Sequence, residues 1–312
     1  MPGYELIDKK EFSQVSEVFK KSKTLFRMGF DKQRKGIFKV QEFETNFAKK
    51  FKSKNALAVT SCTAALRVAL ATLNLNKKDE VITQSFTFVA TVEAIVESGA
   101  IPVCTDINET LNMDPNDLIR KINKKTKAVI VVHMLGVPAQ LDKIKKICKK
   151  YKITLIEDTA WGCGGKFKNR FLGTWGDIGA YSFDFAKTLT TGEGGMLLFK
   201  SKKKFELAKA WHDHGHENNP KYPRWEDTRK SSGFNFRMTE MQGAVGIAQL
   251  QKLNFIIKKQ RMNHDLIWNK IKKIPGVRRR LYPKGSQITA DALIIFVKNN
   301  IKALKCRKEL LK

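Results

Sequence analysis

Lys187 lies in an apolar stretch, YSFDFAKTLTTGEGGMLLF (residues 181–199), that continues into a glycine-rich turn. The neighbours Phe183, Phe185 and Leu189 indicate that the lysine is partly buried. Burial disfavours the charged ammonium and lowers its pKa, so a neutral amine becomes accessible and can form a Schiff base with an aldehyde. The alternative is an ordinary lysine whose stem packs on apolar surface before a hairpin. This stretch alone does not decide between the two.

Other polar and aromatic residues follow predicted strands. Asp158 follows an apolar strand and could pair with a pyridinium nitrogen, although a carboxylate there also caps turns. Phe88 could stack on a flat ring, or it could be an ordinary core residue. Thr63 directly precedes a predicted helix, where free amides and a hydroxyl favour a phosphate, although most such positions are simple caps. Ser182, five residues before Lys187, is a further phosphate donor. Together they predict a pyridoxal phosphate site.

A strand–helix alternation is predicted to position these residues. We expect a mainly parallel α/β sheet with helices on both faces, which binds ligands at the carboxyl ends of its strands. The predicted strands are 56–60, 81–84, 101–105, 128–133, 153–156, 179–183 and 196–199, and the predicted helices between them are 64–73, 89–98, 115–123 and 140–151.

The two ends of the chain differ from this alternation. Residues 1–35 are predicted to form an N-terminal helix (9–22) and an arm, and residues 36–236 to form the large α/β domain, which opens with a helix in 36–51. Residues 237–312 are predicted to be a long helix of about 35 residues followed by a small α+β domain, with a strand at 290–297 and a helix at 301–311.

Composition bounds the function. The net charge is +29, and 46 of the 59 basic residues are Lys. Proteins that recognise nucleic-acid bases or bind phosphate groups with bidentate hydrogen bonds use mainly Arg. We therefore favour a solvated basic face, and keep open a nucleic-acid-binding alternative that uses the basic residues 250–312. Five cysteines without a CxxC pair, no apolar run of about 18 residues and no signal peptide predict a cytoplasmic protein without a metal site.

Several long motifs resemble the DegT/DnrJ/StrS family of PLP-dependent sugar aminotransferases, which have the type I aspartate aminotransferase fold. The resemblance covers roughly residues 36–260. The motifs are VTSCTAALRVAL (59–70), DEVITQSFTFVATVEAIVESGAIPV (79–103), TKAVIVVHMLGVPAQLDKI (126–144), LIEDTA (155–160), YSFDFAKTLTTGEGGM (181–196) and GFNFRMTEMQGAVGIAQLQKL (233–253).

The resemblance implies a reaction and a role for each candidate residue. The reaction is amino transfer from a donor, glutamate, to a nucleotide-linked or acidic keto sugar, for cell-surface polysaccharide biosynthesis. Lys187 would bind the cofactor covalently and move the proton, and Asp158 would pair with the pyridine nitrogen. The other implied contacts are Phe88 on the ring, Thr63, Ala64 and Ser182 on the phosphate, and Asn235 or Arg237 from the second subunit of a homodimer.

Two features depart from the family's pattern, and one segment is similar to particular members. Trp161 stands on the substrate side, where the family often has Gln, His or Glu. The segment 211–229 contains His214 and His216 and is similar to a substrate-side loop of 8-amino-octulosonate transaminases; the alternative is that these histidines are ordinary loop residues. The chain stops at Lys312, so we expect the small C-terminal domain to be truncated. A non-catalytic regulatory protein with this fold, or one that binds nucleic acid, remains the main alternative; a decarboxylating or carbon–sulfur PLP enzyme fits less well.

Overall fold

A computed structural model describes residues 2–219, 221–229 and 231–311. In this part of the chain, seven strands form one sheet in the order β1-β9-β8-β5-β4-β2-β3. Only β9 runs antiparallel to its neighbours, so the predicted mainly parallel sheet is confirmed. The strands are β1 (Asn55–Val59), β2 (Glu80–Gln84), β3 (Ile101–Thr105), β4 (Thr126–Val132), β5 (Thr154–Asp158), β8 (Ile178–Ser182) and β9 (Gly195–Phe199).

Helices cover both faces of the sheet because successive strand residues point to opposite sides. Leu57, Ile130 and Ile156 pack with α4 (Cys62–Ala71), α5 (Val89–Glu97) and α8 (Lys202–Trp211) on one face. On the other face, strand residues of opposite parity pack against α3 (Lys39–Phe51) and α9 (Glu240–Ile271), or against α6 (Pro115–Lys121) and α7 (Leu141–Tyr151).

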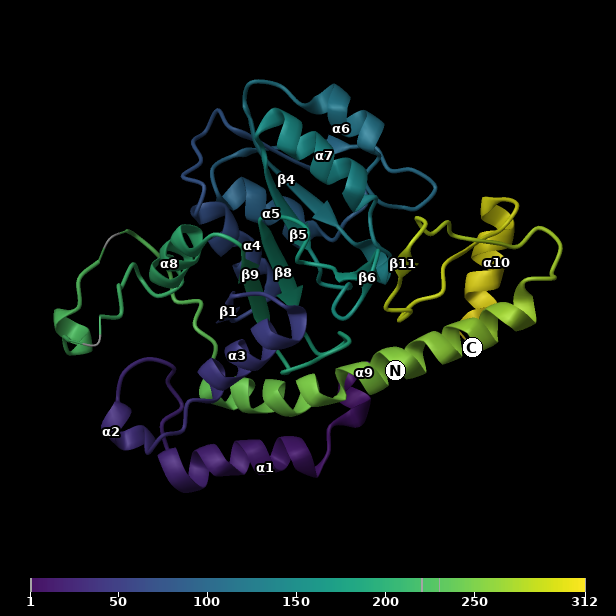
Figure 1. Cartoon of the computed structure of the whole chain (residues 1–312). Coiled ribbons are helices and arrows are strands. Elements are labelled where there is room, and N and C mark those ends of the chain that lie inside the picture. Colours follow the sequence, from purple (N-terminus) through teal and green to yellow (C-terminus); the bar gives the residue numbers. More distant parts are fainter. Residues whose placement is uncertain (1, 220, 230, 312) are drawn as a thin grey trace.

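The N-terminal residues pack along the long helix α9. A 3₁₀ turn (Gly3–Leu6), α1 (Lys9–Glu17) and a π turn (Val18–Ser22) precede the short α2 (Asp31–Arg34). Figure 1 shows α1 running beside α9, which extends from beneath the sheet to the C-terminal elements. Helix α9 begins with a capping box between Thr239 and Gln242.

The C-terminal elements are small. The strands β10 (Arg278–Arg279) and β12 (Ile295–Phe296) pair with each other, and α10 (Asn300–Leu310) follows. The strand β11 (Ser286–Gln287) instead joins β6 (Lys166–Phe167) and β7 (Arg170–Phe171) at the edge of the large α/β part. The three-part division at residues 35/36 and 236/237 stays a prediction.

The element predictions were wrong in a few places. The strand predicted at 290–297 is limited to Ile295–Phe296, because Ala290 has a left-handed backbone (φ +63°) and only the short β10 lies alongside. Helix α8 was missed. Asp158 is the last residue of β5 rather than following it, and the helix predicted within 36–51 begins at Lys39. No helix in the described ranges is long and apolar enough to cross a lipid bilayer.

Candidate functional site

A cavity of about 350 Å³ lies at the carboxyl ends of β4, β5 and β8. Parallel strands bring their carboxyl ends to one edge of a sheet, and loops from that edge complete the walls. Six residues singled out in the sequence line this cavity: Thr63, Phe88, Asp158, Trp161, Ser182 and Lys187.

Lys187 enters the cavity from the loop between β8 and β9. Its backbone amide donates to the carbonyl oxygen of Asp184 (3.1 Å), and its Nζ lies 3.4 Å from the centre of the Trp161 ring. Burial lowers the pKa of Lys187, against the opposing effects of Asp184, Cys62 and Asp158. The cavity therefore holds an amine that loses its proton more readily than a surface lysine.

The Trp161 ring should oppose this loss, because the face of an aromatic ring favours a cation over a neutral amine. Such contacts contribute about 0.5–2 kcal/mol, and one pKa unit corresponds to about 1.4 kcal/mol. We expect Trp161→Leu to lower the pKa of the amine of Lys187 by about 0.4–1.5 units. The measurement is the pH midpoint of Lys187 labelling by an amine reagent, followed by mass spectrometry. Trp161→Phe should keep most of the effect, and an unchanged midpoint in Trp161→Leu would contradict the interpretation.

Asp158 presents a buried carboxylate to the same cavity. It is 5% exposed; the Thr91 hydroxyl donates to Oδ2 (3.0 Å) and the amide of Ala160 to Oδ1 (3.1 Å). Burial raises the pKa of Asp158, although these two hydrogen bonds and the charges of His133 and Lys187 oppose the rise. Its ionised form is therefore short of partners, and a cationic N–H group placed against it would be strongly bound.

The residue before Asp158 holds the strand end in place from the other face of the sheet. Glu157 is fully buried and accepts from His133 Nε2 (3.0 Å) and from the amides of Gly173 (2.8 Å) and Gly176 (2.6 Å). Burial alone would raise the pKa of Glu157, but these bonds outweigh it and the pKa is lowered. Glu157 is thus a charged structural residue that fixes the end of β5, and its carboxylate makes its hydrogen bonds outside the cavity.

The start of helix α4 forms one wall. Ser61 caps the helix and accepts from the amide of Ala64 (3.0 Å), so that amide is already used and Ala64 does not line the cavity. Thr63, in the first turn, is exposed to the cavity. Gly195 lets β9 approach the turn closely, because a Cβ there would lie 2.4 Å from the Ser61 carbonyl oxygen. Free first-turn amides with a nearby hydroxyl suit an anion.

Ser182 and Phe88 complete the set. Ser182 ends β8, is 5% exposed, and its Oγ accepts from the amide of Asp184 (3.3 Å), which leaves its proton able to bind an anion. Phe88 stands at the N-cap of α5 and is 68% exposed, which is unusual for so large an apolar side chain. A flat ring that covered Phe88 would bury this surface.

Four predicted site residues lie elsewhere. The His216 ring contacts Asp227 (3.1 Å), and His214 is exposed. Asn235 is exposed, whereas the Arg237 guanidinium is bonded to Asp213. Within one chain, His214 and His216 therefore do not line the Lys187 cavity, although they were predicted to contact the substrate. Ion pairs within their own loop hold them elsewhere. Pro220, in the same loop, lies outside the described residues.

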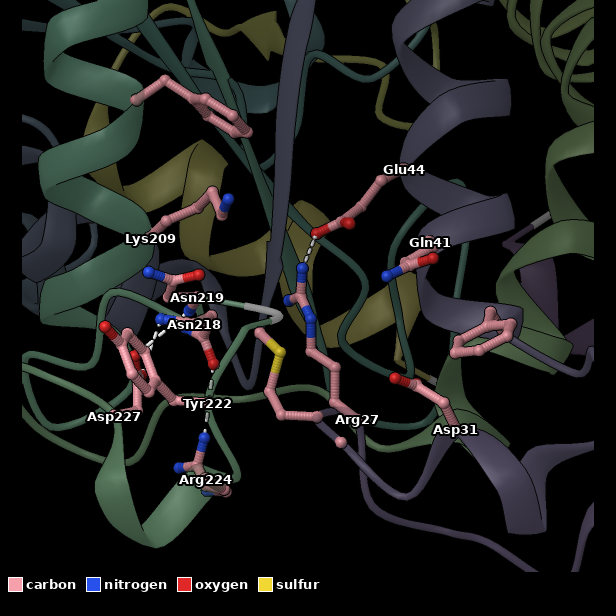
Figure 2. A pocket seen from close by; sticks show the side chains of 14 residues that line it. Arg27, Asp31, Gln41, Glu44, Lys209, Asn218, Asn219, Tyr222, Arg224 and Asp227 are labelled. Carbon is pink, nitrogen blue, oxygen red and sulfur yellow. Dashed lines mark hydrogen bonds and ion pairs between the residues drawn. The ribbon is translucent and has the colours of Figure 1, made fainter.

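That loop instead walls a second cavity of about 400 Å³, shared with residues 27–44. Figure 2 shows its polar and charged side chains, among them Arg27 bonded to Glu44, and Asp227, which accepts from the backbone amide of Asn218. Arg224 is likewise paired with Asp213 (2.5 Å). These charges are compensated by protein partners, so this cavity is not an obvious site for a charged ligand.

The sequence reasoning missed several residues around the Lys187 cavity. Thr91 holds Asp158, and it lies one helical turn after Thr87, which it contacts (2.8 Å); that spacing is a readable signal. Thr289 could not have been found, because the C-terminal segment folds back over a long sequence distance. Its hydroxyl donates to the Trp161 carbonyl oxygen (3.1 Å), and its amide to that of Gly136 (3.1 Å).

The chain is similar to known aminotransferases in sequence and in structure. It is 36% identical to the GDP-perosamine synthase of Escherichia coli O157:H7, over 77% of this chain and 65% of that protein. It is 35% identical to EpsN of Bacillus subtilis, a putative pyridoxal phosphate-dependent aminotransferase, over 77% of this chain and 62% of that protein. The chain thus spans less than two thirds of the length of these relatives.

Among solved structures, the aminotransferase TlmJ from Streptoalloteichus hindustanus superposes with a TM-score of 0.87 at 27% identity, covering 96% of this chain and 79% of that one. The sequence profile of the DegT/DnrJ/EryC1/StrS aminotransferase family matches residues 15–312. The match covers nearly the whole chain and includes the strand ends that carry Asp158 and Lys187. The chain therefore belongs to the DegT/DnrJ/EryC1/StrS aminotransferase family.

Proposed function

We propose that the chain is a pyridoxal phosphate-dependent aminotransferase that converts a keto sugar to an amino sugar, with glutamate as the amino donor. The observation that carries the proposal is one cavity that contains both the half-buried amine of Lys187 and the buried carboxylate of Asp158. A bound cofactor would supply an aldehyde for the amine and a protonated pyridine ring that accepts electrons.

The cavity fits the three chemical parts of pyridoxal phosphate. Asp158 would hold the pyridine N–H, and its raised pKa indicates a carboxylate that lacks such a partner. The exposed face of Phe88 would cover the ring. Thr63, Ser182 and the first amides of α4 would hold the phosphate, and Ala64 would contribute little because Ser61 takes its amide.

Lys187 would also act as the proton carrier. Its Nζ, once free, can take a proton from a bound substrate carbon and return it to a neighbouring atom, and a lowered pKa makes the neutral base available near neutral pH. Trp161 would face the substrate, since it contacts the same nitrogen. The GDP in the name of the Escherichia coli relative favours a nucleotide-linked sugar over a free one.

A homodimer is part of the proposal. Arg237 is bonded to Asp213 within its own chain, so Asn235 is the better candidate to reach the phosphate bound by a second copy. Exposed aromatic side chains on the same segment, Tyr222 (51%), Trp225 (83%) and Phe234 (56%), indicate a surface that a second copy would cover. His214 and His216 would meet a substrate only across such an interface. Cytoplasmic location and a role in cell-surface polysaccharide synthesis stay predictions.

The nucleic-acid alternative rests on the net charge of +29 and on the basic residues in 250–312. The relatives described above are aminotransferases or synthases and give it no support.

The test of the function is a substrate screen. Purified chain loaded with pyridoxal phosphate is mixed with glutamate and a panel of nucleotide-linked and acidic keto sugars, and 2-oxoglutarate release is measured together with amino-sugar mass. We expect turnover with at least one nucleotide-linked keto sugar. If the chain acquires no cofactor absorbance and instead binds DNA in a salt-dependent way, the proposal is wrong.

A further inference from the structure

The first residues of the chain contact the backbone of Lys187 directly. The amide of Gly3 donates to the carbonyl oxygen of Lys187 (3.0 Å). This bond joins the 3₁₀ turn Gly3–Leu6, which we call the N-terminal turn, to the loop between β8 and β9. Nothing in the residues 2–6 suggested such a contact, because it spans more than 180 positions of sequence.

The site that receives Gly3 has no room for a side chain. Gly3 is buried, and a Cβ there would lie 2.5 Å from Gln249 Oε1 and 2.9 Å from the carbonyl oxygen of Thr188. The second of these atoms belongs to the loop's own backbone, so it cannot move without moving Lys187. Glycine is therefore needed for close approach rather than for an unusual backbone angle.

A ring stack adds a second contact to the same loop. The rings of Tyr4 and Phe185 lie 4.3 Å apart between centroids with planes 11° apart. Phe185 stands two residues before Lys187, so the bond at Gly3 and this stack hold the loop at two neighbouring points. Aromatic pairs of this kind contribute about 0.5–1.5 kcal/mol beyond the area that they bury.

The N-terminal turn is itself fixed to helix α9. Lys252 Nζ donates to the carbonyl oxygen of Leu6 (2.5 Å) and pairs with Glu11 (2.7 Å) and Asp8 (3.1 Å). Gln249, one helical turn earlier, donates to the other oxygen of Glu11 (2.9 Å). Helix α9 thus provides a rigid support, and the N-terminal turn transmits its position to the loop.

We propose that Gly3 and Tyr4 are positioning residues for Lys187: they fix the loop so that the amine points at the cavity. The importance of this position for catalysis rests on the proposed function, because it assumes that Lys187 is the reacting group. A misplacement of a reacting group by about 1 Å can cost on the order of 10²-fold in rate. The N-terminal turn lines no part of the cavity, so its effect on the reaction acts through the loop.

Two readouts test the proposal on the full chain, with any purification tag at its C-terminal end. The first is hydrogen exchange of the amides of residues 184–191 in the cofactor-free protein. The second is the rate at which added pyridoxal phosphate becomes attached to Lys187, trapped by borohydride reduction. We expect Tyr4→Ala to raise loop exchange and to slow attachment, each by about 3- to 10-fold, and Gly3→Val to have a larger effect.

The controls separate positioning from general stability. Tyr4→Phe keeps the ring stack and should behave as the wild type. Phe12→Ala removes an exposed ring (73%) from α1 and should change neither readout. If Tyr4→Ala and Phe12→Ala give equal loop exchange, the proposal is overturned. If the wild-type chain attaches no pyridoxal phosphate while Tyr4→Ala still loosens the loop, the proposed function fails but the positioning role stands.

Discussion

Replacing Lys187 by Ala is expected to abolish the covalent attachment of pyridoxal phosphate and to reduce turnover by at least about 10²–10⁴-fold, the usual contribution of a positioned acid–base group. The structure shows the reason: Lys187 Nζ is the amine that faces Trp161 in the cavity, and burial lowers its pKa. The measurement combines the absorbance spectrum, borohydride trapping with peptide mass analysis, and kcat in the transfer assay.

A second lysine gives the matched control. Lys204 is also half-buried, its pKa is also lowered by burial, and its Nζ contacts only the Thr154 hydroxyl (3.2 Å) among the contacts described, away from the cavity. Lys204→Ala should leave spectrum, trapping and kcat within about twofold of wild type, because Lys204 does not line the cavity. Equal loss in both variants would mean that lysine burial in general, rather than Lys187, determines cofactor attachment.

The candidate site was largely predictable because its residues follow strands. Asp158 and Ser182 end the neighbouring strands β5 and β8, and Lys187 lies in the loop that follows β8, so the chain order of strands and helices predicts that these residues meet. Short apolar runs that alternate with helical segments predicted most of the strands, because strands of a parallel sheet are buried on both faces. A local sequence pattern does not predict contacts between distant segments, such as Gly3 with Lys187 or Thr289 with Trp161.

The missed elements have weak local signals. Helix α8 (SKKKFELAKAW with its cap) buries only Ala208 and Ala210, while Phe205 and Trp211 are partly buried against the core. Lysines at 202–204 and 209 interrupt this short apolar face. The run ADALIIFV suggested a full strand, yet its residues from 291 to 297 are only half-buried and Ala290 turns the chain. His214 and His216 were placed by resemblance to a loop, and one chain alone cannot bring them to the cavity.

Asp158→Asn is expected to reduce kcat by about 10²–10⁴-fold, because removing one partner of a buried ion pair typically costs 3–5 kcal/mol and each factor of ten in rate corresponds to about 1.4 kcal/mol. The shape of the side chain is kept, and the Thr91 hydroxyl can reverse its role and accept from the new amide. The loss should therefore appear in kcat, with the folded structure intact. Steady-state kinetics on cofactor-loaded protein measures it.

The same substitution should leave the cofactor-free chain as stable as the wild type, or more so, at neutral pH. Burial raises the pKa of Asp158 above its unfolded value, so the ionised carboxylate costs stability at every pH above that value. Asparagine removes this cost, and its advantage should shrink as the pH falls and Asp158 becomes protonated in both the folded and the unfolded chain. Thermal denaturation between pH 4 and pH 8, roughly the range over which a perturbed carboxyl group titrates, measures the trend.

Asp227→Asn is expected to change the stability of the chain in the opposite direction. Asp227 is also buried, but the amides of Asn219 and Asn218 and the ring of His216 outweigh burial and lower its pKa, so its charge stabilises the fold above the unfolded pKa. Asparagine at 227 should therefore destabilise the chain at neutral pH, and this loss should disappear as the pH falls through the lowered pKa. A pair of variants with opposite stability trends, of which only Asp158→Asn also loses kcat, would show that Asp158 is retained for its charge toward a ligand. If Asp158→Asn instead destabilises the chain as Asp227→Asn does, Asp158 is a structural residue and its proposed bond to the pyridine nitrogen loses its support.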